Sequence, residues 1–190
     1  MNEPVLEAIH RRRVVRARTS QPVERQQVEV VLEAARYAPN AGNRHLQRFV
    51  AIQEPATLRV LRMVCPGMLQ RPAAAIVICV DGSRAESLGF SPGSRGLYVD
   101  VGTAAATMLL AAYAIGLGSG PVTSFSRAAV TAILNLPAGW SPELIICLGH
   151  PAPDQPPAMG PRRPVTWKDL THWERLPETG PAGGTSSGTA

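Results

Sequence analysis

Residues 100–125 read DVGTAAATMLLAAYAIGLGSGPVTSF, and no charged residue occurs from Val101 to Ser126. An uncharged run of this kind can be a membrane span, which needs about 20 apolar residues. Gly116–Pro121 interrupts the run, so the expected helix, Val101–Ile115, has roughly 15 residues and is too short to cross a bilayer. We therefore predict an alanine-rich core helix, in a protein without a membrane partner.

The glycine-rich run Gly116–Pro121 (GLGSGP) resembles the phosphate loop of dinucleotide-binding proteins. That loop follows a strand and begins a helix. The present run instead ends the expected helix and precedes a short strand around Val122. Its expected roles are to cap the helix and to allow a close backbone approach, where a flat ligand could lie.

Strands and helices alternate irregularly along the chain. Ala73–Val80 (AAAIVICV) is a continuous apolar run that predicts a strand buried on both faces, and Glu143–Leu148 (ELIICL) predicts a second buried strand. The helical spacing of apolar residues in Glu24–Ala38 predicts an amphipathic helix that Pro39 ends. This pattern predicts a mixed α/β layered domain. The other expected elements are helices over Pro4–Arg13, Pro55–Met63 and Ser126–Leu134, a strand over Arg48–Gln53, and a polar loop, a candidate lid, over Gly82–Arg95.

Length and composition fit one globular domain, because the chain has 190 residues and 45% of them are hydrophobic. We expect this domain over residues 1–176 and a flexible Gly/Ser/Thr/Pro tail over residues 177–190. Cys65, Cys79 and Cys147 form no CxxC pair, which indicates buried free thiols in a reducing compartment rather than disulfides or a zinc site. The first residues lack an apolar signal core, so we expect a cytoplasmic protein.

Residues 11–18 (RRRVVRAR) contain five arginines, whose forked guanidinium groups match the oxygen atoms of a phosphate. The cluster predicts either a phosphate site for a cofactor or a solvated basic face that contacts nucleic acid or an acidic partner. Aromatic residues make up only 5% of the chain and none lies among these arginines, which argues against stacking on single-stranded nucleic acid. The chain has no HExxH, GxSxG or Walker motif, and this favours a redox enzyme whose cofactor supplies the chemistry.

Four separated segments, in this order, resemble the nitroreductase family of FMN enzymes. They are AIHRRRVVRARTSQPV (8–23), EAARYAPNAGNRHLQRFVAI (33–52), DVGTAAATMLLAAYAIGLGSGPVTSF (100–125) and LIICLGHPAPDQPPAMGPRRPVTWKDL (144–170). The resemblance implies an α+β fold, a three-layer α/β/α sandwich with a mainly antiparallel central sheet. It also implies FMN as the cofactor and a homodimer whose subunits share the active sites.

The resemblance assigns most of the arginine cluster to the flavin. Arg12 and Arg16 match basic residues near the FMN phosphate and the pyrimidine edge of the flavin ring, where a positive charge favours the anionic reduced ring. Val14 stands where the family has a phosphate-binding serine, so only its backbone amide could serve, with Arg13 or Arg11 as a compensating side chain. Arg13 and Arg18 are also candidates for plain surface residues.

The loop Pro39-Asn40-Ala41-Gly42-Asn43 matches the family's Pro-Ser-x-x-Asn loop. In the family this loop reaches the flavin from the other subunit. His45 follows it at a position where glutamine is usual, and its role stays open. The family's polar contacts to flavin N3 and O4 have no counterpart that we can assign in Leu61–Gln70.

Two later segments also match family positions around the flavin. Pro121-Val122-Thr123-Ser124 matches the segment that lies along the isoalloxazine ring, and the Ser124 amide is the candidate donor to flavin N5. Thr123 stands at a position that is acidic in some members. Arg162, with Arg163 as the close alternative, matches a late basic residue that returns to the phosphate.

The same resemblance implies a ping-pong oxidoreductase. NADH or NADPH reduces the flavin and leaves, and a small electron-poor acceptor such as a nitroaromatic or a quinone takes its place. Other tasks stay open on the same fold: a dehydrogenase of a small or peptide-derived substrate, a dehalogenase, a flavin-destroying enzyme or a deazaflavin-binding protein. A basic module that binds nucleic acid is the alternative from another class, and its binding would be salt-sensitive. We expect no nucleic-acid partner.

Overall fold

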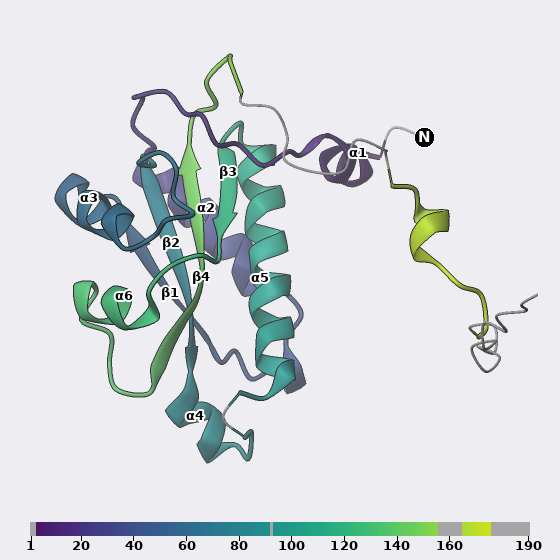
Figure 1. The fold of residues 1–190 in the computed structure, drawn as a ribbon. Coiled ribbons are helices and arrows are strands. Elements are labelled where there is room, and N and C mark those ends of the chain that lie inside the picture. The colour runs from purple at the N-terminus through teal and green to yellow at the C-terminus, as the bar shows by residue number, and fades with distance from the viewer. Residues whose placement is uncertain (1–2, 92, 156–164, 176–190) are drawn as a thin grey trace, which may run out of the picture. The chain divides into compact units, whose positions relative to one another are not determined.

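The computed structural model describes residues 3–91, 93–155 and 165–175. The chain divides into two compact units, Met1–Pro156 and Pro157–Ala190. The first unit contains the sheet and the helices that cover it (Figure 1). The described part of the second unit includes a short 3-10 helix, η2 (Trp167–Leu170), and its Trp167 ring meets the Trp173 ring edge to face at a centroid distance of 6.5 Å. The predicted tail, residues 177–190, lies outside the described residues.

Four strands form one sheet in the order β1-β2-β4-β3, and all three pairings are antiparallel (Figure 1). The central strands β2 (Ala74–Asp81) and β4 (Trp140–Gly149) contain the two predicted apolar runs. Strands β1 (Gln47–Ile52) and β3 (Gly118–Val122) lie at the two edges. Every residue from 74 to 80 is buried, which confirms the prediction of a strand covered on both faces.

Successive side chains of β2 point to opposite faces of the sheet and divide the core into two clusters. Ile76 and Ile78 belong to the cluster under α2 and α5, whereas Val77 and Cys79 belong to the cluster under α3 and α6. Figure 1 shows the two pairs of helices on opposite sides of the sheet, so the predicted three-layer sandwich is confirmed. The covering helices are α2 (Arg25–Arg36), α3 (Pro55–Met63), α5 (Arg95–Ala114) and α6 (Arg127–Ile133).

Local signals in the sequence account for several helix ends. The Ser126 hydroxyl accepts a hydrogen bond from the Ala129 amide at 3.3 Å and begins α6, as predicted. Gly116 takes a φ of 77° directly after α5, which agrees with its predicted capping role. The first helix, α1 (Pro4–Arg11), is amphipathic but contains no buried residue.

Helix α5 begins at Arg95, earlier than the predicted start at Val101. The additional turns form because Leu97 and Asp100 continue the buried stripe of the helix at helical spacing. By length and composition alone α5 could cross a membrane. It packs instead on α2 and on strands β2, β3 and β4, as the predicted core helix does.

Two further segments differ from the sequence-based expectation. Residues 82–87 form a helix, α4 (Gly82–Ser87), and not an open polar loop. The Asp81 carboxylate accepts from the Arg84 amide at 3.1 Å and Ala85 is buried, so this short helix is capped and anchored. In addition, the glycine-rich run from Gly118 onward belongs to β3 itself rather than to a loop that precedes it.

Candidate functional site

The arginine-rich segment runs along the edge of the sheet beside β3. Val14 bridges Ser119 in parallel register. Gln155 holds the next residues, because its side-chain oxygen accepts from the amides of Arg16 and Ala17, both at 3.2 Å, and its side-chain amide donates to the Ala17 carbonyl at 2.7 Å. The segment therefore covers the open edge of β3 and its backbone is fixed.

Glycines in β3 and β4 make this close contact possible. A Cβ at Gly118 would lie 2.6 Å from Cγ1 of Val15, and a Cβ at Gly149 would lie 2.6 Å from Cδ of Arg18. A Cβ at Gly120 would lie 3.1 Å from the Val15 carbonyl oxygen. The close backbone approach predicted for the glycine-rich run is present, and the approaching group is the arginine segment of the same chain.

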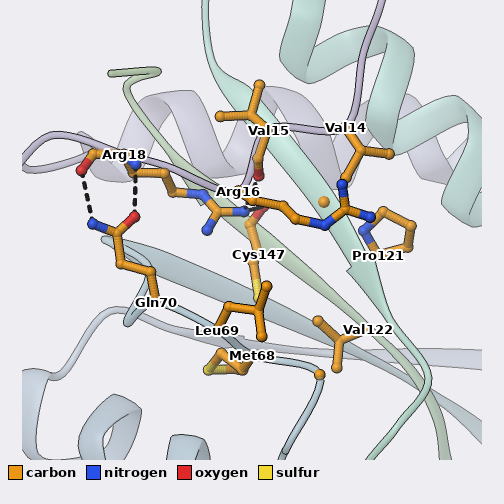
Figure 2. A pocket seen from close by; sticks show the side chains of 12 residues that line it. Val14, Val15, Arg16, Arg18, Met68, Leu69, Gln70, Pro121, Val122 and Cys147 are labelled. Atoms are coloured by element: carbon orange, nitrogen blue, oxygen red, sulfur yellow. Dashed lines mark hydrogen bonds between the residues drawn. The ribbon is translucent and has the colours of Figure 1, made fainter. Parts of the chain in front are cut away.

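A pocket lies between this segment and the chain that precedes β2 (Figure 2). Arg16 and Arg18 cross it, residues 67–70 form the opposite wall, and Pro121 and Val122 line it from β3. It encloses only about 30 Å³, whereas a small-molecule site has roughly 300–1,000 Å³. The pocket of the single chain is therefore too small to enclose a small-molecule ligand.

Arg18 is 8% exposed, so the expectation of a surface position is wrong for this residue. Gln70 binds its backbone on both sides, because the side-chain oxygen accepts from the Arg18 amide at 2.6 Å and the side-chain nitrogen donates to the Arg18 carbonyl at 3.0 Å (Figure 2). Nη2 donates to the Val15 carbonyl at 2.7 Å and to the Cys147 carbonyl at 3.5 Å. Burial lowers the pKa of the guanidinium, but arginine stays charged in proteins.

The other arginines of the cluster differ in whether their side chains already have partners. Arg13 is exposed, and its Nη1 donates back to the carbonyls of His10 at 2.5 Å and Arg12 at 3.0 Å. Arg12 lines a second pocket, of about 300 Å³, and its Nη1 is buried without a hydrogen-bond partner in the described chain. Among the described residues, the Arg16 side chain has no hydrogen-bond or ion-pair partner. Arg12 and Arg16 are therefore available to an anion, whereas Arg13 is engaged locally.

The end of β3 and the residues that follow it offer backbone groups beside the same pocket. Pro121 is exposed and Val122 is buried behind it. The Ser124 carbonyl accepts from the Gly67 amide at 3.2 Å, while the Ser124 amide has no acceptor among the described residues. Thr123 is exposed. The Ser124 amide is therefore available to donate a hydrogen bond to a ligand atom.

The loop over residues 39–43 is fixed to α5. The Ala41 amide donates to the Asp100 carboxylate, and the Thr103 hydroxyl donates to the Pro39 carbonyl at 2.7 Å. Asn40 closes the loop, because its side-chain oxygen accepts from the His45 amide at 2.9 Å. Burial raises the pKa of the Asp100 carboxyl, and the hydrogen bond from Ala41 acts in the opposite direction.

The loop and the arginine segment lie at different ends of α5. Asp100 and Thr103 hold the loop, whereas Tyr113 lines the pocket that contains Arg12. Tyr113 follows Asp100 by thirteen positions along the helix, a rise of roughly 20 Å. The described chain thus brings Arg16, Pro121 and Val122 together, but not the loop with Asn43. Arg162 and Arg163 lie outside the described residues.

Sequence reasoning missed three residues that build the site: Arg18, Gln70 and Asp100. Asp100 had a signal, because it is a lone charge directly before the uncharged stretch, where it would be buried with the helix. Gln70 had none, since its contacts are to backbone groups of Arg18, far away in the sequence.

The fold and site define an α/β/α sandwich that presents unpaired arginines at the edge of an antiparallel sheet. The sequence profile of the nitroreductase family matches residues 9–87 and 65–150, and the chain belongs to this family. The NADH dehydrogenase of Thermus thermophilus is 28% identical over 200 residues, which cover 87% of this chain and 98% of that protein.

Two further relatives agree. The FMN reductase (NAD(P)H) of Bacillus subtilis is 25% identical over 168 residues, covering 80% of this chain and 67% of that protein. The solved structure of nitroreductase A from Vibrio parahaemolyticus superposes with a TM-score of 0.79 at 25% identity, covering 95% of this chain and 79% of the other. The resemblance inferred from the sequence and the fold that it implied are confirmed, and the chain belongs among oxidoreductases.

Proposed function

We propose that this chain is an FMN-dependent oxidoreductase that takes hydride from NADH or NADPH and reduces a small electron-poor acceptor such as a nitroaromatic or a quinone. The observation that carries the proposal is the pair Arg12 and Arg16, which have no counter-ion among the described residues and lie on a fixed segment. A buried donor such as Nη1 of Arg12 is unfavourable unless a ligand accepts from it. The name of the Bacillus subtilis relative supports both the flavin and the NAD(P)H assignment.

The spacing of the two arginines suits a ligand with a phosphate at one end and a ring system at the other. An extended chain advances about 3.3 Å per residue, so four residues separate Arg12 and Arg16 by up to about 13 Å. In the proposal Arg12 binds the phosphate and Arg16 lies at the pyrimidine edge of the ring. The Val14 amide has no acceptor among the described residues and serves as a further phosphate donor.

The end of β3 and the residues that follow it orient the ring in this proposal. Pro121 and Val122 form the surface on which the ring lies, and the free amide of Ser124 donates to its N5 edge. When bound, FMN supplies the hydride-transfer chemistry, while the protein binds, orients and sets the local charge. Arg162 or Arg163 is proposed as an additional phosphate ligand on the strength of the family resemblance alone.

A second subunit completes the site in the proposal. The pocket of one chain is too small to enclose a flavin, and the loop with Asn40, Ala41 and Asn43 is held far from it. In a homodimer this loop reaches the flavin of the partner. Apolar side chains without cover in the single chain support such a contact, namely Val5, Leu6 and Ile9 on α1 and Tyr98 and Val99 on α5.

The local structure favours a small ligand over nucleic acid. Arg18 is buried and Arg13 is tied to α1, so the cluster does not present five free cations to a polymer. We therefore propose a protein without a nucleic-acid partner. We also propose that it has no membrane partner and is located in the cytoplasm, where its thiols stay reduced.

A different reaction on the same fold, with a deazaflavin or without NAD(P)H, is the second candidate function. It would appear as a failure of NAD(P)H to reduce the bound cofactor.

Titration of the apoprotein with FMN tests the proposal. Arg12→Ala/Arg16→Ala removes two charge-assisted contacts, and we expect FMN affinity to fall at least about 100-fold, since each such bond contributes roughly 1.5–3 kcal/mol. Arg25→Ala/Arg84→Ala, which removes two exposed arginines elsewhere, should bind FMN as the wild type does. Circular dichroism confirms that each variant is folded. Wild-type FMN affinity in the Arg12/Arg16 variant would show that the phosphate binds elsewhere.

A further inference from the structure

Arg18 is a buried cation that has no counter-ion in the described part of the chain. Among the described residues it is the only buried basic side chain, and no carboxylate lies within ion-pairing distance of it. Its Nε is buried and has no hydrogen-bond partner in the described chain. Burial of an unpaired charge is strongly unfavourable, so its position needs an explanation beyond packing.

Several residues hold Arg18 in this position. Gln70 binds its backbone amide and carbonyl, and the Val15 carbonyl accepts from Nη2. Gly149 leaves the space that Cδ occupies, and Gly120 leaves the space beside Nη2, which a Cβ there would approach to 3.2 Å. Strands β3 and β4 both have a glycine where this side chain lies, so the fold specifically accommodates the buried Arg18.

The groups next to the Arg18 guanidinium, a thiol and two backbone carbonyls, do not neutralise its charge. Burial raises the pKa of the Cys147 thiol to about 11, so the thiol is uncharged at neutral pH. The carbonyls of Val15 and Cys147 supply dipoles but no charge. Arg18 lines the pocket together with Arg16, Pro121 and Val122, and Figure 2 shows the Arg16 side chain between Arg18 and Pro121.

We infer that Arg18 is a second, buried cation of the flavin site, which stabilises the negative charge that the ring acquires on reduction. The inference rests on the proposed function. Hydride uptake brings two electrons and one proton to a neutral ring and leaves it with one negative charge, while NAD(P)H becomes NAD(P)⁺. A cation held in a poorly solvated site acts more strongly on that charge than an exposed one and needs no reorganisation.

The consequence concerns the choice of acceptor. A buried positive charge raises the reduction potential of the bound flavin, because it favours the reduced ring over the oxidised one. Hydride uptake from NAD(P)H becomes more favourable, and only acceptors that are themselves easily reduced can reoxidise the enzyme. Arg18 thereby shifts the preference of the enzyme toward acceptors of higher reduction potential, such as quinones.

The reduction potential of FMN-loaded protein, measured against a redox dye under anaerobic conditions, tests the inference. Arg18→Met should lower the preference for reduced over oxidised FMN at least tenfold, which is about 30 mV for a two-electron couple. Arg18→Lys keeps the charge and should stay within a threefold change, and Arg25→Met should match the wild type. If Arg18→Met does not fold, Arg18→Gln replaces it, because glutamine is neutral and can still donate to the Val15 carbonyl.

Two further measurements, on the apoprotein and on riboflavin-loaded protein, distinguish a role at the flavin ring from a structural role and from a contact with the phosphate. We expect apo Arg18→Met to unfold at the same or a higher temperature than the apo wild type, since it loses an uncompensated buried charge. A large drop in that temperature with an unchanged flavin potential would show a purely structural role and overturn the inference. A potential that changes with FMN but not with riboflavin would place Arg18 at the phosphate and overturn it also. Wild type that takes up no FMN overturns the proposed function, whereas FMN-loaded protein whose potential ignores Arg18 overturns this inference alone.

Discussion

The carboxylate of Asp100 accepts the backbone amide of Ala41 with both oxygens, at 2.9 and 3.1 Å. Asp100 is 4% exposed and lies on α5, a 20-residue helix of the core, so the bond ties an irregular loop to a long, packed helix. Gly42 and Asn43 follow with φ angles of 57° and 54°, a left-handed conformation that glycine and asparagine adopt more readily than other residues. The loop is therefore preformed before any partner or ligand arrives.

Removal of this anchor should loosen the loop. In Asp100→Ala the Ala41 amide loses its acceptor, and we expect a loss of about 1–3 kcal/mol in the free energy of unfolding. Hydrogen exchange at the Ala41 amide, followed by NMR, should accelerate in the same variant. Thr103→Val, which removes only the bond to the Pro39 carbonyl, should leave that exchange rate close to the wild-type rate. Unchanged exchange in Asp100→Ala would contradict the anchoring role.

Asp100 should also make stability depend on pH. Burial raises the pKa of its carboxyl, so the folded chain holds the proton more tightly than the unfolded chain does. The carboxyl therefore stabilises the fold relative to an uncharged amide at low pH, and this contribution is lost as pH rises through the raised pKa. The measurement is the difference between the unfolding free energies of the wild type and Asp100→Asn. This difference should be largest below a pH of about 3.9, the ordinary pKa of aspartate, and should decrease as the pH is raised toward 7. A difference that rises with pH would show that the carboxylate form is the favoured one.

Gly149 should be intolerant of a side chain because of Arg18. A Cβ there would lie 2.6 Å from Cδ of Arg18, and we expect Gly149→Ala to destabilise the fold by about 1–3 kcal/mol in urea unfolding. Arg18→Ala removes the clashing atom, so the double variant should lose less than the sum of the single variants. Gly96→Ala is the control, since its Cβ would meet only the Ser94 hydroxyl at 3.8 Å. Strict additivity would mean that the two residues do not compete for space.

The sequence determined the core of the fold more reliably than its periphery. Ala73–Val80 and Glu143–Leu148 were predictable as strands because continuous apolar runs need cover on both faces. Helix α4 was not predictable from its polar composition, because one buried residue, Ala85, and a cap from Asp81 form too short a signal. The start of α5 could not be predicted, because the charged residues Arg95 and Asp100 indicate a loop. Only the folded structure shows that Asp100 is buried.

The site divides in the same way. Arg12 and Arg16 could be identified because the chemistry of arginine and their local pattern point to a phosphate. The burial of Arg18 could not be, since it depends on Gly149 and Gln70, which only the fold brings to it. All three cysteines are free and buried, as predicted from the absence of a CxxC pair.

The buried thiols should resist modification. Burial raises the pKa of Cys65 and Cys147 to about 11 and that of Cys79 to about 12. Only the thiolate reacts, so a disulfide reagent at pH 8 should label the folded chain at least about 100-fold more slowly than the chain in urea. The measurement is the release of the coloured leaving group with time. Labelling of the folded chain at the rate of the unfolded one would show that a cysteine is accessible.

The most direct test of the flavin assignment is the visible absorption spectrum of the purified protein after incubation with FMN and removal of free ligand, followed by acid release and identification of what is bound. The account predicts about one FMN per chain and a spectrum that bleaches when NADH or NADPH is added without oxygen. Folded, colourless protein that retains no FMN would contradict it.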